Sequence, residues 1–127
     1  MKKTNIILVL LFFFNSLFVV AYAQINKVPA SNKPIEYKQP DSTILTIVLR
    51  GDENLHWAET IDKYTLLSNS DGGYEYAKLD NSNNLIRSNK LAHNSEKRTK
   101  KEKRFLKKIP KELKFSVFQI KNSKSKN

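Results

Sequence analysis

Between residues 41 and 90, hydrophobic and polar positions alternate in short runs that predict β-strands. In segment 43–49, Leu45, Ile47 and Leu49 lie on one face, and Ile44, Thr46 and Val48 lie on the other. This pattern is typical of a central strand covered on both sides. Further runs at 55–60, 64–69, 74–79 and 85–87 are separated by polar turns such as Ser70-Asp71-Gly72-Gly73. We therefore expect an antiparallel meander of four or five short strands over residues 41–90.

The sequence on either side of this region has a different pattern. Residues 24–40 contain three prolines, which predicts an extended lead-in, and Ile35-Glu36-Tyr37 can add an edge strand. Residues 91–114 predict a helical segment that Asn94 or Ser95 caps and Pro110 interrupts. Phe105, Leu106, Ile109 and Leu113 form one apolar stripe in its second half. Residues 115–127 are polar and predict a disordered tail, so the expected fold class is α+β with a basic C-terminal helix.

The first 23 residues have the pattern of a signal-peptide helix. A basic start, Met1-Lys2-Lys3, precedes an apolar run from Ile6 to Val20 and the small-residue site Ala21-Tyr22-Ala23. We expect cleavage between Ala23 and Gln24 and a secreted, periplasmic or cell-surface location. The alternative is a retained anchor, but the run is shorter than the roughly 20 residues that span a bilayer. The sequence has no cysteine, so disulfides are excluded.

Positive charge is concentrated in the helical segment. The chain has a formal net charge of +11, and residues 97–114 hold ten Lys or Arg against two Glu. Such a cluster can contact anionic polymers or membranes, or it can simply be a solvated face. Exposed aromatic side chains that would stack on bases are missing, so no nucleic-acid readout is expected. The candidate contacts are Lys97, Arg98, Lys100, Lys101, Lys103, Arg104, Lys107 and Lys108.

Motifs for catalysis or metal binding are weak. Glu53 and His56 have a spacing that places two ligands together only on a helix, whereas this region predicts turn and strand. His93 is the only other histidine, so neither a metal nor another cofactor is expected. No nucleophile motif surrounds any serine, and we expect no enzyme activity. The adhesion-like tripeptide Arg50-Gly51-Asp52 is better interpreted as a turn, in which Gly51 supplies positive φ and Asp52 accepts backbone hydrogen bonds.

Several segments, taken in order, resemble a known family. They are Gln39-Pro40-Asp41, Gly51-Asp52-Glu53, His56-Trp57, Tyr64, Gly73 to Ala77 with Tyr74 and Tyr76, and Ala92-His93-Asn94. Together they resemble the N-terminal region of secreted bacterial M6 metalloproteases, the immune inhibitor A-like peptidases, over residues 34–110. Ser42 and Lys63 stand where that pattern usually has a turn glycine. A non-glycine residue at positive φ costs on the order of 1 kcal/mol.

The resemblance implies a propeptide-like role. In the family this region precedes a catalytic domain with a His-Glu-x-x-His helix, and this sequence contains no such motif, so peptidase activity is not implied. What it implies is an exported, non-catalytic module that assists folding or latency of a metalloprotease catalytic domain. The chain would be either a truncated protease gene product or a partner acting in trans. The alternative is a secreted surface-binding protein that uses the basic helix, and nothing indicates the oligomeric state.

Overall fold

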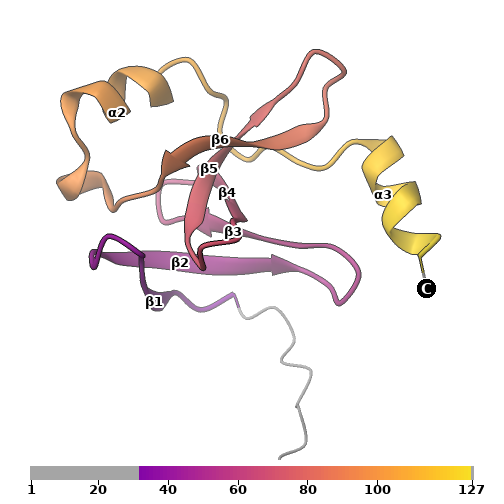
Figure 1. Cartoon of the computed structure of the whole chain (residues 1–127), viewed down its shortest axis with the longest axis horizontal. Helices are drawn as coiled ribbons and strands as arrows, with labels where there is room; N and C mark the ends of the chain where they lie inside the picture. The colour runs from indigo at the N-terminus through magenta and orange to yellow at the C-terminus, as the bar shows by residue number, and fades with distance from the viewer. Residues whose placement is uncertain (1–31, 127) are drawn as a thin grey trace, which may run out of the picture.

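A computed structural model describes residues 32–126 of the chain, and within this range the fold is α+β, as expected. The predicted signal peptide, its cleavage site at Ala23 and Gln24, and residues 24–31 of the lead-in lie outside the described residues. A six-stranded antiparallel sheet is followed by a 3₁₀ turn and two α-helices (Figure 1). The elements are β1 (Ile35–Lys38), β2 (Ile44–Gly51), β3 (His56–Thr60), β4 (Thr65–Ser68), β5 (Tyr74–Leu79), β6 (Leu85–Leu91), η2 (Ser95–Lys97), α2 (Lys100–Leu106) and α3 (Val117–Lys124).

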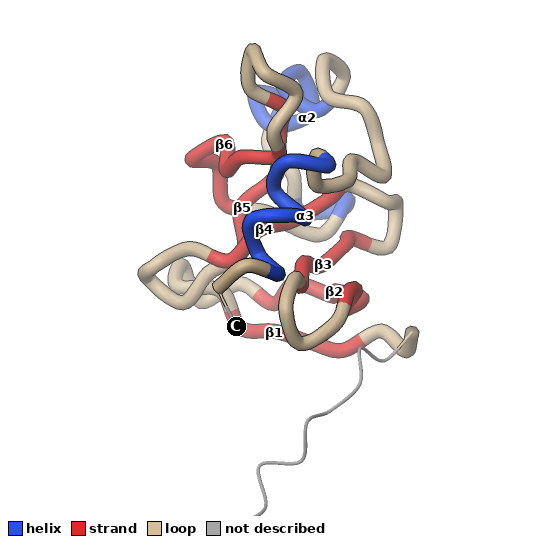
Figure 2. Tube along the Cα trace, turned by 90° about the vertical axis from the view of Figure 1, so that its right-hand side faces the viewer, coloured by secondary structure: helices blue, strands red, loops and turns tan. Residues whose placement is uncertain are grey.

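The sheet is a simple meander in which each strand pairs with the next along the chain. In Figure 2 the strands follow one another from β1 at the bottom to β6 near the top, where α2 lies. The sheet has one strand more than the four or five predicted, because the candidate edge strand in the lead-in pairs with β2 through Tyr37 and Leu45. β5 has the predicted bounds, and β6 continues past the predicted end at residue 87 to Leu91.

Four of the five hairpins use the same three-residue loop. In each, a residue accepts a hydrogen bond from the N–H three positions later and donates its own N–H to the carbonyl four positions later. This loop twists in the same sense as the strands when its third residue adopts positive φ. The positive-φ residues are Ser42 (69°), Lys63 (75°), Gly72 (73°) and Asn83 (59°). Ser42 and Lys63 therefore keep the glycine-type conformation, and the two turns are not remodelled by the non-glycine residues.

The remaining hairpin, between β2 and β3, depends on Gly51. Its φ is 93°, and a Cβ at this position would collide with the Leu55 carbonyl oxygen. Asp52 Oδ1 accepts hydrogen bonds from the N–H groups of Asn54 and Leu55 at 2.9 and 3.0 Å. The predicted positive φ of Gly51 and the backbone hydrogen bonds of Asp52 are confirmed, but Arg50 and Gly51 are the last residues of β2 and the turn begins at Asp52.

The two faces of the sheet carry separate apolar clusters. The first contains Leu45, Ile47, Ala58, Leu66, Tyr76, Ala92 and Leu106, with Phe105 packed against it. The second, on the other face, contains Ala77, Leu85 and Leu113, with Leu67, Ile109 and Phe115 packed against it. β2 contributes to both faces, since Ile47 is fully buried and Val48 is 7% exposed. Its first residue, Ile44, stays 46% exposed, so the predicted cover on both sides does not extend to that end.

The predicted helix differs from the structure in its length and its cap. Asn94 and Ser95 do not cap α2; Thr99 does, with its side chain accepting from the Glu102 N–H. Arg98 is extended (φ −68°, ψ 133°) and separates the short η2 turn from α2. The apolar stripe is divided because α2 ends at Leu106. Phe105 and Leu106 stay on the first face, and the chain after Leu106 carries Ile109 and Leu113 to the second.

The predicted disordered tail contains helix α3. A capping box formed by Ser116 and Gln119 begins it. The Gln119 side chain also binds the backbone N–H and carbonyl of Leu85, both at 2.9 Å. These two bonds occupy the outer edge of β6 in place of a further strand. Helix α3 depends on these hydrogen bonds to β6, which the amino-acid composition of the segment does not reveal.

The shared loop geometry predicts that glycine at position 42 or 63 stabilises the fold. We expect Ser42→Gly and Lys63→Gly each to raise the free energy of unfolding by about 0.5–1 kcal/mol. Relief of left-handed strain contributes about 1–2 kcal/mol, and the greater freedom of glycine in the unfolded chain offsets about half of it. Urea unfolding followed by circular dichroism measures the change.

Gly72→Ala is the matched control, because it has the same backbone conformation and nothing lies within 4 Å of the added Cβ. It should lower the free energy of unfolding by about 1 kcal/mol through backbone strain alone. An unchanged or lower stability of Ser42→Gly would contradict the strain assignment.

Candidate functional site

A buried glutamine joins three segments that are distant in sequence. Gln39, 2% exposed, donates from Nε2 to the carbonyls of Tyr74 and Ala92 at 2.9 and 2.8 Å. Its Oε1 accepts from the Tyr74 N–H at 2.9 Å. An amide side chain is suited to this position because it offers both donors and an acceptor. The β1–β2 turn is thereby fixed to β5 and to the end of β6.

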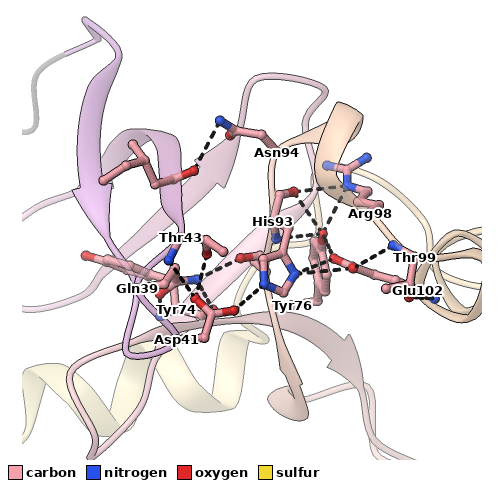
Figure 3. A network of polar contacts seen from close by, with 12 residues as sticks. Gln39, Asp41, Thr43, Tyr74, Tyr76, His93, Asn94, Arg98, Thr99 and Glu102 are labelled. Carbon is pink, nitrogen blue, oxygen red and sulfur yellow. Dashed lines mark hydrogen bonds and ion pairs between the residues drawn. The ribbon is translucent and has the colours of Figure 1, made fainter.

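The hydroxyl of Tyr76 is the centre of the polar network drawn in Figure 3. It donates to Glu102 Oε1 at 2.6 Å and accepts from Arg98 Nε at 3.0 Å. Tyr76 is fully buried and Glu102 is 8% exposed. Burial and the hydrogen bond to Glu102 raise the pKa of Tyr76 above its usual range. β5 is thus connected to α2 by a short, charge-assisted bond.

His93 lies between two carboxylates. Its Nε2 is 2.6 Å from Asp41 Oδ2, and its Nδ1 is 3.2 Å from both oxygens of Glu102. Burial alone would lower the pKa of His93, but the hydrogen bond to Asp41 and the charge of Glu102 raise it. The pKa of Asp41, despite partial desolvation, falls to about 2 because His93 and Thr43 donate to it. The geometry is that of an imidazolium donating from both nitrogens.

Arg98 closes the network on its other side. Its Nη1 and Nη2 donate to the two oxygens of Asp62 at 2.6 and 2.7 Å, a bidentate pair. Its Nε also reaches the His93 carbonyl at 3.1 Å. The hydrogen bonds from Arg98 lower the pKa of Asp62 to about 2. The Arg98 side chain is only 6% exposed, so this candidate polyanion contact is instead part of the fold.

The Asn94 side chain binds backbone groups of β2 beyond the end of β3. β3 ends opposite Ile47 at Thr60, which leaves the next backbone groups of β2 without a strand partner. Asn94 Oδ1 accepts from the Thr46 N–H at 2.9 Å, and its Nδ2 donates to the Ile44 carbonyl at 3.3 Å. A side-chain amide therefore continues the ladder where the neighbouring strand turns away.

A separate charged cluster lies on the other face of the sheet. Glu59, 3% exposed, is 3.0 Å from Arg50, 3.5 Å from Lys114 and 3.9 Å from Lys63. Burial alone would raise the pKa of Glu59, but the hydrogen bond and charge of Arg50 lower it. Lys114 Nζ also lies 5.1 Å from the Trp57 ring centre. Arg50 thus binds a buried carboxylate within the fold.

The family-matching residues divide into two groups in space. Tyr64, Tyr74, Tyr76 and His93 lie in or against the first core and its network. Gly51, Asp52, Glu53, His56 and Trp57 belong to the β2–β3 hairpin, and Ala77 belongs to the second core. Trp57 packs edge-on against Phe115 at 5.9 Å between ring centres, while His56 is exposed.

Sequence reasoning missed several members of the network as site residues. They are Gln39, Asp41, Asp62, Asn94 and Glu102, with Arg98 assigned only as a surface cation. One pattern could have found Glu102, since Thr99-x-x-Glu102 is a capping box. The others are brought together only by the strand register, which local sequence does not specify.

The remaining basic candidates are all exposed. Lys97 ends η2, Lys100, Lys101, Lys103 and Arg104 lie on α2, and Lys107 and Lys108 follow it. Among residues 32–126, no cluster of three or more His, Cys, Asp or Glu side chains could hold a metal ion. Over the same residues, no helix is both long and apolar enough to cross a bilayer.

Comparisons with protein-family models, curated proteins and solved structures found no match to this chain.

The arrangement is suited to holding a fold together. Both ring nitrogens of His93 are engaged within hydrogen-bond reach of carboxylates, and the Tyr76 hydroxyl both donates and accepts. A general acid or base needs an open position toward a substrate. A cleft of about 240 Å³ does border the network, lined in part by Asn94, Asp62 and Arg98. These three side chains are themselves bound within the protein.

The geometry of His93 predicts a stability that falls as the pH rises above neutrality. A folded-state pKa above 6.5 means that the imidazolium contribution is fully present below pH 6.5 and is lost as the pH passes the folded pKa. Asp41 and Asp62 have the opposite pH dependence. Their folded-state pKa values are about 2, so the stability that their ionised forms contribute is lost as the pH falls from about 4 to 2. The free energy of unfolding in urea, measured from pH 3 to 9, should therefore be greatest at about pH 4–6.5.

His93→Gln should lower the free energy of unfolding by about 1–3 kcal/mol at pH 5.5, because two hydrogen bonds to charged groups are lost. It should also flatten the alkaline limb of the profile. His56→Gln is the control, since His56 is exposed and outside the network, and it should keep the wild-type profile. An unchanged alkaline limb in His93→Gln would contradict the imidazolium assignment.

Proposed function

We propose that the chain is an exported, non-catalytic module that acts on a metalloprotease catalytic domain in the manner of a pro-region. The observation that carries the proposal is the convergence of the matched segments. The side chains of Gln39, Asp41, Tyr76 and His93, from three separate parts of the resemblance, meet in one network that also uses the Ala92 carbonyl. This supports a resemblance at the level of a whole fold, because residues that build one network depend on one another.

A non-catalytic role agrees with how the titratable groups are used. The charged side chains of the network are paired at distances of 2.6–3.2 Å. His93 binds Asp41 and Glu102, and Arg98 binds Asp62. Such a network rigidifies and specifies a core. A binding module needs this rigidity because it presents a surface that must not change shape.

The mode of action that fits these residues is steric. The chain has no cysteine, so a thiolate cannot ligate and silence a catalytic zinc. His93 is committed to two carboxylates, and the exposed His56 would be one lone imidazole on a rigid hairpin. A latency function would therefore cover the catalytic cleft with a preformed surface, and a folding function would offer the same surface to an incompletely folded catalytic domain.

A refolding assay with a purified M6 catalytic domain tests the proposal. Native chain added during dilution from denaturant should raise the recovered peptidase activity several-fold, or should inhibit the folded enzyme. Gly51→Val, in which the added side chain collides with the Leu55 carbonyl, is the misfolded control and should do neither. An unrelated protein of equal positive charge controls for charge alone. If refolding yield and enzyme activity both stay unchanged, the proposal fails.

Export is tested separately by the N-terminal sequence of the protein recovered outside the cytoplasm. The apolar run and the Ala21-Tyr22-Ala23 site predict a mature chain that begins at Gln24. Ala23→Arg should leave an unprocessed precursor because a large side chain does not fit beside the cleavage site, whereas Tyr22→Phe should be processed normally. Recovery of only the full-length chain would contradict cleavage.

A further inference from the structure

Helix α3 exposes three large apolar side chains within four residues. Val117 is 69% exposed, Phe118 is 65% exposed and Ile120 is 37% exposed. The other exposed large hydrophobics of the described chain, such as Ile44 and Ile61, are single residues in other segments. Moving side chains of this size out of water is favourable. The α3 surface is therefore the strongest apolar feature among the described residues.

The opposite side of α3 is bound to the sheet, so this exposure is built into the fold. Gln119 makes two backbone bonds to Leu85, and the Ser116 hydroxyl donates to Asn84 Oδ1 at 2.6 Å. Figure 1 shows α3 at one end of the molecule and α2 at the other. The polar anchors turn Gln119 toward β6 and leave Val117, Phe118 and Ile120 directed away from it.

Lysine residues flank the apolar residues along the chain and share their side of α3. Backbone hydrogen bonds and, to a smaller extent, the charge of Lys124 lower the pKa of Asp52 on the β2–β3 hairpin. Lys121 and Lys124 lie on α3 itself, Lys114 precedes it and Lys126 follows it, and all four are exposed. The sequence from 113 to 127 contains these four lysines and no acidic residue. Of the wider segment 97–126, 13 residues are basic and two are acidic, a net charge of +11. One of the two acids, Glu102, is buried in the network.

The combination fits the interface of an anionic bilayer better than a protein groove. Aromatic and aliphatic side chains insert beneath the headgroups, and each nearby lysine adds electrostatic attraction to a negatively charged membrane. A stable protein contact needs about 800 Å² on each partner, which three side chains of one short helix do not supply. A nucleic acid would gain from stacked aromatics, and α3 offers only Phe118.

We propose that the α3 face formed by Val117, Phe118, Ile120, Lys121 and Lys124 docks on anionic lipid bilayers. The apolar side chains enter the headgroup boundary while the two lysines bind lipid phosphates. The contact is reversible, because its apolar area is small and its electrostatic part is screened by salt. This surface lies apart from the polar network and does not depend on the metalloprotease proposal.

The single tryptophan of the chain allows a local test. In a Phe118→Trp variant of the full chain, vesicles of phosphatidylglycerol and phosphatidylcholine that contain brominated lipid should quench the added tryptophan. The wild type reports only Trp57, which packs against Phe115, and should be quenched much less. A reporter on α3 is quenched only where α3 itself reaches the lipid, and the charge variants below separate this contact from tethering by the apolar N-terminal segment.

Two charge-matched variants in the Phe118→Trp background decide whether α3 is the docking face. Lys121→Glu/Lys124→Glu should reduce the quenching at least five-fold, whereas Lys100→Glu/Lys101→Glu on α2 should retain most of it. Equal loss in both variants would assign the effect to diffuse positive charge and overturn the proposal. Equal quenching on pure phosphatidylcholine, an absence of quenching, or retention on heparin that these vesicles cannot displace would also overturn it.

Discussion

The buried carboxylate of Glu102 is the group on which the arrangement of this fold depends. A carboxylate that is 8% exposed requires partners, because an unpaired buried charge costs several kcal/mol. Tyr76 supplies a hydroxyl from β5, His93 supplies a ring nitrogen from the end of β6, and Thr99 supplies a backbone N–H. A seven-residue helix such as α2 is not stable in isolation. Glu102 therefore performs two tasks, since it caps α2 and attaches it to the sheet.

The network can form only if the sheet has the correct register. Asp41 and Asp62 are the middle residues of two hairpin loops with the same hydrogen-bond pattern, and they bind His93 and Arg98 from opposite sides. A loop one residue longer would displace its aspartate and reverse the faces of the following strand. This requirement explains why Ser42 and Lys63 remain at positive φ (69° and 75°). The short loop is retained despite its backbone strain.

Local pattern was sufficient to predict most of the sheet. The bounds of β5 and the positive φ of Gly51 were predicted correctly, because strand alternation and turn preferences depend on neighbouring residues. The helical segment predicted at 91–114 was wrong in its cap and length, because Arg98 is extended where its side chain binds Asp62, 36 residues earlier. Helix α3 was missed for a similar reason, since Gln119 binds Leu85 across 34 residues. Contacts of this kind depend on the folded register and leave no periodic trace in the sequence.

The same limit applies to the site. His93, Tyr64, Tyr74 and Tyr76 were identified by their order in a family pattern, while their partners Asp62 and Glu102 were not. Arg98 was grouped with the surface cations because charge density along a segment does not reveal which member is buried. Gln39, Asp41 and Asn94 belonged to the matched segments, yet an amide that continues a sheet edge, as Asn94 does at Thr46, looks like any loop asparagine.

The distribution of charge follows from these uses of the acidic residues. Residues 32–96 hold ten acids and seven bases, a net charge of −3, against +11 in residues 97–126. Five of those acids bind groups of the chain itself. Asp52 and Asp80, at the surface, bind turn N–H groups, and Asp41, Glu59 and Asp62 bind cationic side chains. The lysines of α2 and α3, in contrast, extend into solvent. Glu59 and Asp62 are thus neutralised within the fold, whereas the surface positive charge of the described chain is concentrated in its C-terminal part.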